Sequence, residues 1–83
     1  KAIELFAGAG GLGIGVSQAG FAPACIVEWN KWCCDTIRFN REKDGGPVAH
    51  WPDPFHGDVR SVSFGHLEGT IALVSGGPPC QPF

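Results

Sequence analysis

The sequence predicts an α/β fold, and more narrowly the first half of a doubly wound fold built on a parallel sheet. Two observations carry this prediction. An apolar run at the start is followed by a glycine-rich loop and then by apolar residues at helical spacing. Strand-like and helix-like segments then alternate, as they do where right-handed crossovers join parallel strands. With 83 residues, the chain has room for one small domain at most.

The first elements follow from the apolar pattern. Within residues 1–6 (KAIELF), Ala2, Ile3, Leu5 and Phe6 form an apolar run that only Glu4 interrupts, which is typical of a strand buried in a parallel sheet. The loop AGAGGLG follows, and apolar residues then recur at helical spacing over 12–19. Gly20 stands where a left-handed residue would end this helix, and we expect Phe21 to pack back on it.

The next two elements also have clear signals. A second short strand is expected at 24–28 (ACIVE). Asn30 can cap a helix over 31–43, with Cys33 and Ile37 on its buried face.

The second half of the chain is less regular. Residues 44–57 hold three prolines and three glycines, which predicts a long irregular connection. Residues 58–62 (DVRSV) predict a strand end and a turn. The strongest strand prediction of the whole chain is 70–76 (TIALVSG).

The charge balance and the lack of long apolar runs exclude some functions for these residues. Six Lys and Arg against eight Asp and Glu give a net charge of −2, which argues against a phosphate-binding surface here. No apolar run reaches the length of a membrane span, so no membrane contact is expected.

Four cysteines occur, and their spacing argues against both disulfides and zinc. Cys33 and Cys34 are adjacent, no C-x-x-C pair exists, and the histidines complete no zinc spacing. We therefore expect reduced thiols and no metal, with Cys25, Cys33 and Cys34 as small core residues.

A glycine motif indicates a nucleotide-like ligand. Gly8, Gly10 and Gly13 satisfy G-x-G-x-x-G between a predicted strand and helix. Glu28 ends the second strand, where a carboxylate can accept hydrogen bonds from ribose hydroxyls. Trp29 can stack on an adenine ring. The pattern predicts an adenosine-type cofactor but leaves a nicotinamide dinucleotide and S-adenosylmethionine both open.

The last eight residues, GGPPCQPF, place Cys80 among prolines directly after the strongest predicted strand. The carboxyl ends of parallel strands are where open α/β sheets bind ligands, and prolines stiffen the backbone. Cys80 is therefore a candidate nucleophile, although nothing in the sequence identifies a group that would activate its thiol.

The segments FAGAGGLG, EWN, GDV and GGPPCQPF occur in the order and approximate spacing of the cytosine-C5 DNA methyltransferases. The chain resembles the N-terminal part of their catalytic domain over essentially its whole length. The resemblance implies a Rossmann-like fold dependent on S-adenosylmethionine. It places the donor against Phe6, Ala7, Gly8, Gly10, Gly11 and Leu12 in the loop, Glu28 at the ribose, Trp29 at the adenine face, Asp58 and Val59 at the adenine edge, and Pro79 at the border.

The same resemblance implies the reaction. Cys80 would add to C6 of a flipped-out cytosine in DNA, and C5 would then take the methyl group. Two alternatives stay open: a methyltransferase acting on cytosine in transfer RNA, and a non-catalytic S-adenosylmethionine-binding module or half of a split enzyme. A nicotinamide dehydrogenase is the least favoured, because nothing in that class requires PPCQ.

The resemblance also sets expectations beyond these residues. A Glu-Asn-Val segment, an Arg-rich motif and a target-recognition region follow in the family, and none is present in residues 1–83. We therefore expect an N-terminal fragment of one catalytic domain that is inactive alone. Double-stranded DNA would bind through the C-terminal part. A monomer in the bacterial cytoplasm, with a cognate restriction endonuclease as a possible partner, completes these expectations.

Overall fold

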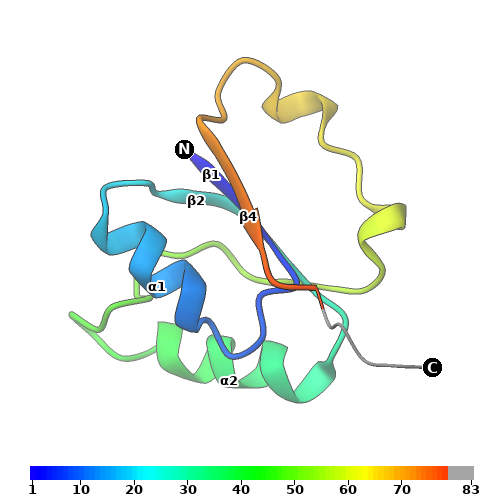
Figure 1. Cartoon of the computed structure of the whole chain (residues 1–83). Coiled ribbons are helices and arrows are strands. Elements are labelled where there is room, and N and C mark those ends of the chain that lie inside the picture. Colours follow the sequence, from blue (N-terminus) through cyan, green and yellow to red (C-terminus); the bar gives the residue numbers. More distant parts are fainter. Residues whose placement is uncertain (79–83) are drawn as a thin grey trace.

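Four strands form one parallel sheet in the order β3-β2-β1-β4 (Figure 1), which confirms the predicted α/β class. The computed structural model describes residues 1–78. Along the chain, the elements are β1 (Ala2–Leu5), α1 (Gly11–Gln18), β2 (Pro23–Glu28), α2 (Lys31–Arg41), β3 (Phe55–His56), the 3-10 helices η1 (Val59–Ser61) and η2 (Gly65–Leu67), and β4 (Leu73–Gly76).

The register brings three chain segments to one edge of the sheet. Leu5, the last residue of β1, pairs with Val27 of β2 and with Gly76 of β4. The glycine loop after β1, Glu28 at the end of β2 and the segment after β4 therefore meet at the carboxyl ends of neighbouring strands. Open α/β sheets bind ligands at this edge.

The two faces of the sheet are covered by different parts of the chain. Ile26 of β2 belongs to the core with Ile37 of α2 and Trp51, whereas the next residue, Val27, lines a hollow with Val59 of η1. Figure 1 shows both α-helices on one side of the sheet and the connection through η1 and η2 on the other. This two-sided cover is that of a doubly wound sheet.

The ends of α1 confirm the sequence prediction. Gly10 caps the helix with a left-handed backbone, at φ 105°. At the other end Gly20 is also left-handed, at φ 99°. Its amide donates to Ser17 O, and the Phe21 amide donates to Val16 O. These two bonds make the Schellman stop that the glycine predicts.

Trp51 supports the glycine loop from the core side, a role that the sequence did not predict. Its side chain is 1% exposed, and its indole Nε1 donates to Ser17 Oγ at 3.0 Å. A Cβ on Gly13 would come within 2.7 Å of the indole, and one on Gly10 within 3.2 Å. The second and third glycines of the motif are therefore required by the approach of Trp51.

Two arginines of α2 hold the segment that carries Trp51. Arg41 Nε donates to the carbonyl of Trp51 at 2.7 Å, and Arg38 Nη2 donates to that of Pro54 at 3.0 Å. Both guanidinium groups also pair with Asp53, at 3.2 and 3.0 Å. The Pro- and Gly-rich connection is thus irregular, as expected, but fixed to α2.

Helix α2 needs one correction. Asn30 caps it as predicted, its side-chain oxygen accepting from the Trp32 and Cys33 amides at 2.9 and 3.2 Å. The buried face, however, carries Cys34 and Ile37, and Cys33 is only half-buried. Cys25 is half-buried too, so Cys34 alone of these three thiols is a fully buried core residue.

The second half of the chain departs further from the sequence prediction. Residues 58–62 form no strand end, because Asp58 caps η1 by accepting from the Arg60 amide. Strand β4 begins only at Leu73, three residues later than expected. The short strand β3, which pairs with Val27 and Glu28, was not predicted. Among the helices of residues 1–78, none is long and apolar enough to cross a membrane.

Candidate functional site

A cavity of about 480 Å³ opens at the carboxyl ends of β1, β2 and β4. Its volume lies in the range of small-molecule sites, which is roughly 300–1,000 Å³. Both the glycine loop and the segment after β4 contribute to its wall. The lining residues are Phe6, Gly8, Glu28, Trp29, Asn30 and Gly77.

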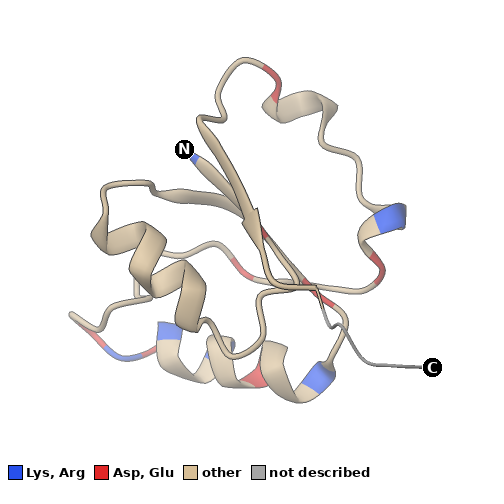
Figure 2. Cartoon of the chain, in the orientation of Figure 1, with Lys and Arg blue, Asp and Glu red and all other residues tan. Residues whose placement is uncertain are grey.

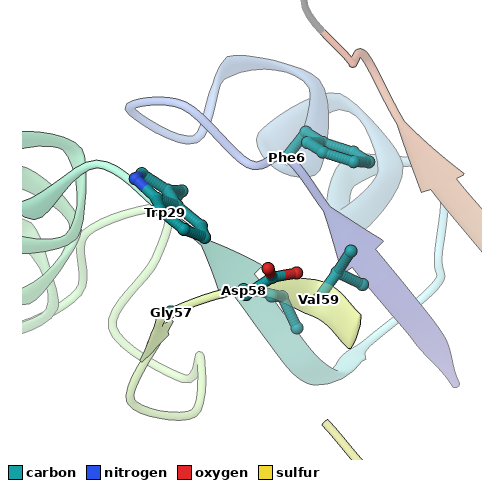
Figure 3. A pocket seen from close by; sticks show the side chains of 6 residues that line it. Phe6, Trp29, Gly57, Asp58 and Val59 are labelled. Carbon is teal, nitrogen blue, oxygen red and sulfur yellow. The ribbon is translucent and has the colours of Figure 1, made fainter. Parts of the chain in front are cut away.

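A smaller hollow of about 50 Å³ adjoins this cavity, because Phe6 and Trp29 line both. Figure 3 shows the Phe6 and Trp29 rings on either side of the opening, with Asp58 and Val59 of the η1 segment between them. Gly57 completes this part of the wall. The structure thus brings together two aromatic rings and a carboxylate, which the sequence places up to 52 residues apart.

Glu28 lies at the base of the cavity and is fixed there by backbone amides. Its Oε1 accepts from the Gly8 amide at 2.7 Å, and its Oε2 accepts from the Asn30 amide at 2.6 Å. A carboxylate has about four acceptor positions, so roughly two remain for a ligand. Glu28 therefore braces the glycine loop, lines the cavity and keeps acceptor capacity that these two amides do not use.

Among residues 1–78, Phe6 is the one non-glycine residue with a positive φ, at 52°. This conformation is unfavourable for a bulky side chain and costs of order 1–3 kcal/mol. Its ring is 40% exposed and lines both parts of the site. Because strain of this kind persists where surrounding structure imposes it, Phe6 is a strong indication of a functional position.

Asp58 is held by its neighbour Arg60. The Arg60 amide donates to Asp58 Oδ1 at 2.8 Å, and the guanidinium Nε donates to Oδ2 at 2.9 Å. The hydrogen bond from the Arg60 side chain, helped by the one from its amide, lowers the pKa of Asp58 below the usual 3.8. Asp58 is therefore an ionised acceptor at neutral pH.

Four of the predicted donor contacts lie outside these lining sets. Ala7 is buried in the core cluster, 6% exposed, and its side chain does not face the cavity. Gly10 lies against Trp51, while Gly11 and Leu12 are exposed at the start of α1. For Ala7 and Gly10 the structure thus offers packing reasons. Pro79 and Cys80 lie outside the described residues.

Four lining residues were not among the predicted contacts: Val27, Asn30, Gly57 and Gly77. Asn30 was expected only as a helix cap. It directly follows Trp29 in the chain and lines the same cavity. Gly57 precedes Asp58, and Gly77 follows β4. Val27, Asn30 and Gly57 each stand next to a residue that the sequence did single out, and Gly77 stands two residues before Pro79. These neighbours are the signal that would have found them.

Two of the described cysteines, Cys25 and Cys34, are not activated. Burial raises the pKa of the Cys25 and Cys34 thiols above the usual 9.0. Cys34 Sγ also donates to the carbonyl of Glu28 at 3.5 Å. Because the thiolate is the reactive form, neither thiol is suited to nucleophilic chemistry. Residues 1–78 contain no group of three or more His, Cys, Asp or Glu able to hold a metal ion.

Most basic residues lie on and just after α2, and Figure 2 shows the others at the N-terminus and on η1. Lys31 pairs with Asp35 at 2.8 Å, and Arg38 and Arg41 pair with Asp53. Their charge is therefore largely balanced within the chain.

Comparison with known proteins gives a consistent answer. The family model described as C-5 cytosine-specific DNA methylase matches residues 1–83. The type II methyltransferase M.PspPI of Psychrobacter sp. (strain TA137) is 44% identical over 98% of the chain and 18% of its own length. M.AquIA of Picosynechococcus sp. is 41% identical over 100% of the chain and 33% of its own. No solved structure matches significantly.

The chain thus spans between about a fifth and a third of the length of these relatives. The match is nevertheless continuous from the first strand to the last residue, and it includes the segments that line the cavity. On this ground the chain belongs to the C-5 cytosine-specific DNA methylase family.

Proposed function

We propose that this chain forms the S-adenosylmethionine site and carries the nucleophile of an enzyme that methylates C5 of cytosine in DNA. The observation that carries the proposal is the cavity at the carboxyl edge of the sheet, with Glu28 fixed at its base by the glycine loop. The family description names DNA, which favours DNA over RNA as the substrate.

The residues present fit S-adenosylmethionine. Glu28 has acceptor capacity left for two ribose hydroxyls, and Trp29, 66% exposed, offers a ring face for adenine. The ionised Asp58 can accept from an exocyclic amine. A Cβ on Gly8 would meet no protein atom within 4 Å, so the loop leaves open space beside the cavity. When bound, the donor would supply an electrophilic methyl group.

In the proposed reaction Cys80 acts on the cytosine ring. Its sulfur bonds to C6 as the C5–C6 π bond opens, so that C5 gains an electron pair. C5 uses this pair to accept the methyl group, and the donor leaves as a neutral thioether. Loss of the C5 proton to a base returns a pair to the ring as the S–C6 bond breaks, which frees the thiolate. The chain contributes placement, because the strand before Cys80 adjoins the strand before the glycine loop.

The test uses the full-length protein, a methyl-labelled donor and duplex DNA. We expect label at C5 of cytosine, and we expect Cys80→Ser to abolish transfer while donor binding is retained. Duplex DNA containing 5-fluorocytosine should trap a covalent adduct at Cys80, because fluorine cannot leave C5 as a cation. Label appearing in transfer RNA instead of DNA would establish the RNA alternative. Normal turnover by the serine variant would remove Cys80 from the mechanism.

The relatives are type II methyltransferases, and from this we further propose a role in restriction–modification with a cognate endonuclease. Such a methylase must protect the sequence that its partner cuts. Expression of the full-length protein should therefore make host DNA resistant to one restriction specificity. Complete digestion by every enzyme that cuts at cytosine-containing sites would contradict this role.

A further inference from the structure

Glu4, in the middle of β1, is a buried acid that the proposed chemistry does not use. It is 2% exposed. Its Oε2 accepts a hydrogen bond from Ser75 Oγ of β4, and its Oε1 has no partner among the described residues. A buried carboxylate with an unpaired oxygen is unfavourable, and an apolar side chain would stabilise the sheet more readily. Packing alone therefore does not account for Glu4.

The position of this pair relates it to the site. Glu4 and Ser75 lie directly opposite each other in the β1–β4 register. Glu4 stands two residues before Phe6, and Ser75 stands two residues before Gly77, both of which line the cavity. The Glu4 carboxyl carbon also lies 3.5 Å from where a Cβ on Gly13 would be, so it faces the first turn of α1.

A second feature fixes the same pair of strands one residue further on. A Cβ on Gly76 would lie 2.6 Å from the carbonyl oxygen of Leu5, a distance that real side chains do not tolerate. Gly76 thus permits β4 to approach the end of β1 closely. The two strands are thus held together, residue by residue, up to their carboxyl ends at Leu5 and Gly76.

We propose that Glu4 and Ser75 are positioning residues for the nucleophile. Their hydrogen bond holds β4 against β1. Cys80 follows Ser75 by five residues in the chain, and β1 leads into the glycine loop. The inference rests on the proposed function. The carboxyl group of Glu4 gives the Ser75 hydroxyl one defined partner across the two strands. Methyl transfer needs this precision, because a misplacement of ~1 Å can cost about a hundredfold in rate.

The test is Ser75→Ala in the full-length protein, with Ser63→Ala, an exposed serine, as the matched control. We expect Ser75→Ala to lower the single-turnover rate at saturating donor and DNA by about tenfold or more. The dissociation constant of the donor should stay unchanged. Ser75→Thr, which keeps the hydroxyl, should restore most of the rate. Glu4→Gln should reduce the rate less than Ser75→Ala, and the double variant should lose less than the two single losses combined.

Three outcomes would overturn the inference. One is a rate for Ser75→Ala equal to that of the Ser63→Ala control. Another is that the lower rate of Ser75→Ala is fully explained by less folded protein or weaker donor binding, and that Ser75→Thr does not restore it. If Ser75→Ala does not fold, Glu4→Gln, which preserves volume, carries the same test, and a wild-type rate there counts against us. Failure of the proposed function looks different: the unmodified enzyme would then transfer no methyl group.

Discussion

Gly8 and Glu28, twenty residues apart in the chain, are joined by a hydrogen bond of 2.7 Å from the Gly8 amide to Glu28 Oε1. The acid at the end of β2 therefore fixes the loop at the end of β1. Glu28 also lines the cavity, and we propose that its remaining acceptor positions give the same side chain a second function, in binding the donor.

Glu28→Ala should weaken S-adenosylmethionine binding. The variant loses a charged acceptor, and each such hydrogen bond is worth ~1.5–3 kcal/mol, so the dissociation constant should rise about tenfold or more. Isothermal calorimetry on the full-length protein measures this.

A donor analogue lacking both ribose hydroxyls separates the two functions of Glu28. The unmodified protein should bind it less tightly than S-adenosylmethionine, whereas Glu28→Ala should bind both about equally. If the variant still discriminates between them, Glu28 only braces the loop and the ribose hydroxyls bind elsewhere.

Gly13→Ala should destabilise the protein. The added Cβ would come within 2.7 Å of the Trp51 indole, which is 1% exposed and cannot move aside easily. Overpacking of this kind costs typically 1–3 kcal/mol. Urea unfolding of the full-length protein measures the change.

Gly15→Ala is the matched control for that substitution. Gly15 is exposed on the same helix, and a Cβ there would meet no atom within 4 Å. Alanine should therefore stabilise the helix by roughly 0.5–1 kcal/mol. Destabilisation of equal size in both variants would mean that the contact with Trp51 is not the cause.

Arg60→Ala should raise the pKa of Asp58 towards its usual 3.8, because the Arg60 side chain is the main cause of its lowering. A carboxylate with a lowered folded-state pKa contributes stability that is complete above the unfolded value. That contribution disappears as the pH falls through the lower folded value. In the variant this contribution should therefore be smaller, and its loss should be complete at a higher pH.

The titration of the Asp58 carboxyl carbon by NMR measures this shift directly. Arg60→Lys is the control, since it keeps the charge and the backbone hydrogen bond but not the guanidinium group. Its Asp58 pKa should fall between those of the unmodified protein and Arg60→Ala. An unchanged midpoint in Arg60→Ala would show that the pair does not form in solution.

The first half of the fold could be predicted because its signals are local. The apolar run before the loop, Gly20 as a stop and Asn30 as a cap each act within a few residues, and each is confirmed. The sequence prediction placed Cys33 rather than Cys34 on the buried face of α2, and this was wrong. Successive side chains of a helix point about 100° apart, and the sequence did not determine which of the two cysteines faces the core.

The second half depends on contacts that no local pattern reveals. Trp51 lies in a segment rich in Pro and Gly without periodicity, and its burial comes from α1, α2 and the glycine loop together. β3 has two residues, too few to show alternation. Of the site, the aromatic and acidic residues were predictable from their motif. That Asp58 caps a 3-10 helix and pairs with Arg60 was not.

Alkylation by iodoacetamide should distinguish the described cysteines. Burial raises the pKa of Cys25 and Cys34, so little thiolate forms there near pH 8, and Cys34 is in addition fully buried. We expect Cys34 to react most slowly, and more slowly than its half-buried neighbour Cys33. Mass spectrometry of peptides after timed labelling of the native protein gives the rates. Equal rates for Cys33 and Cys34 in native protein, with equal rates also after denaturation, would show that α2 does not bury Cys34 as described.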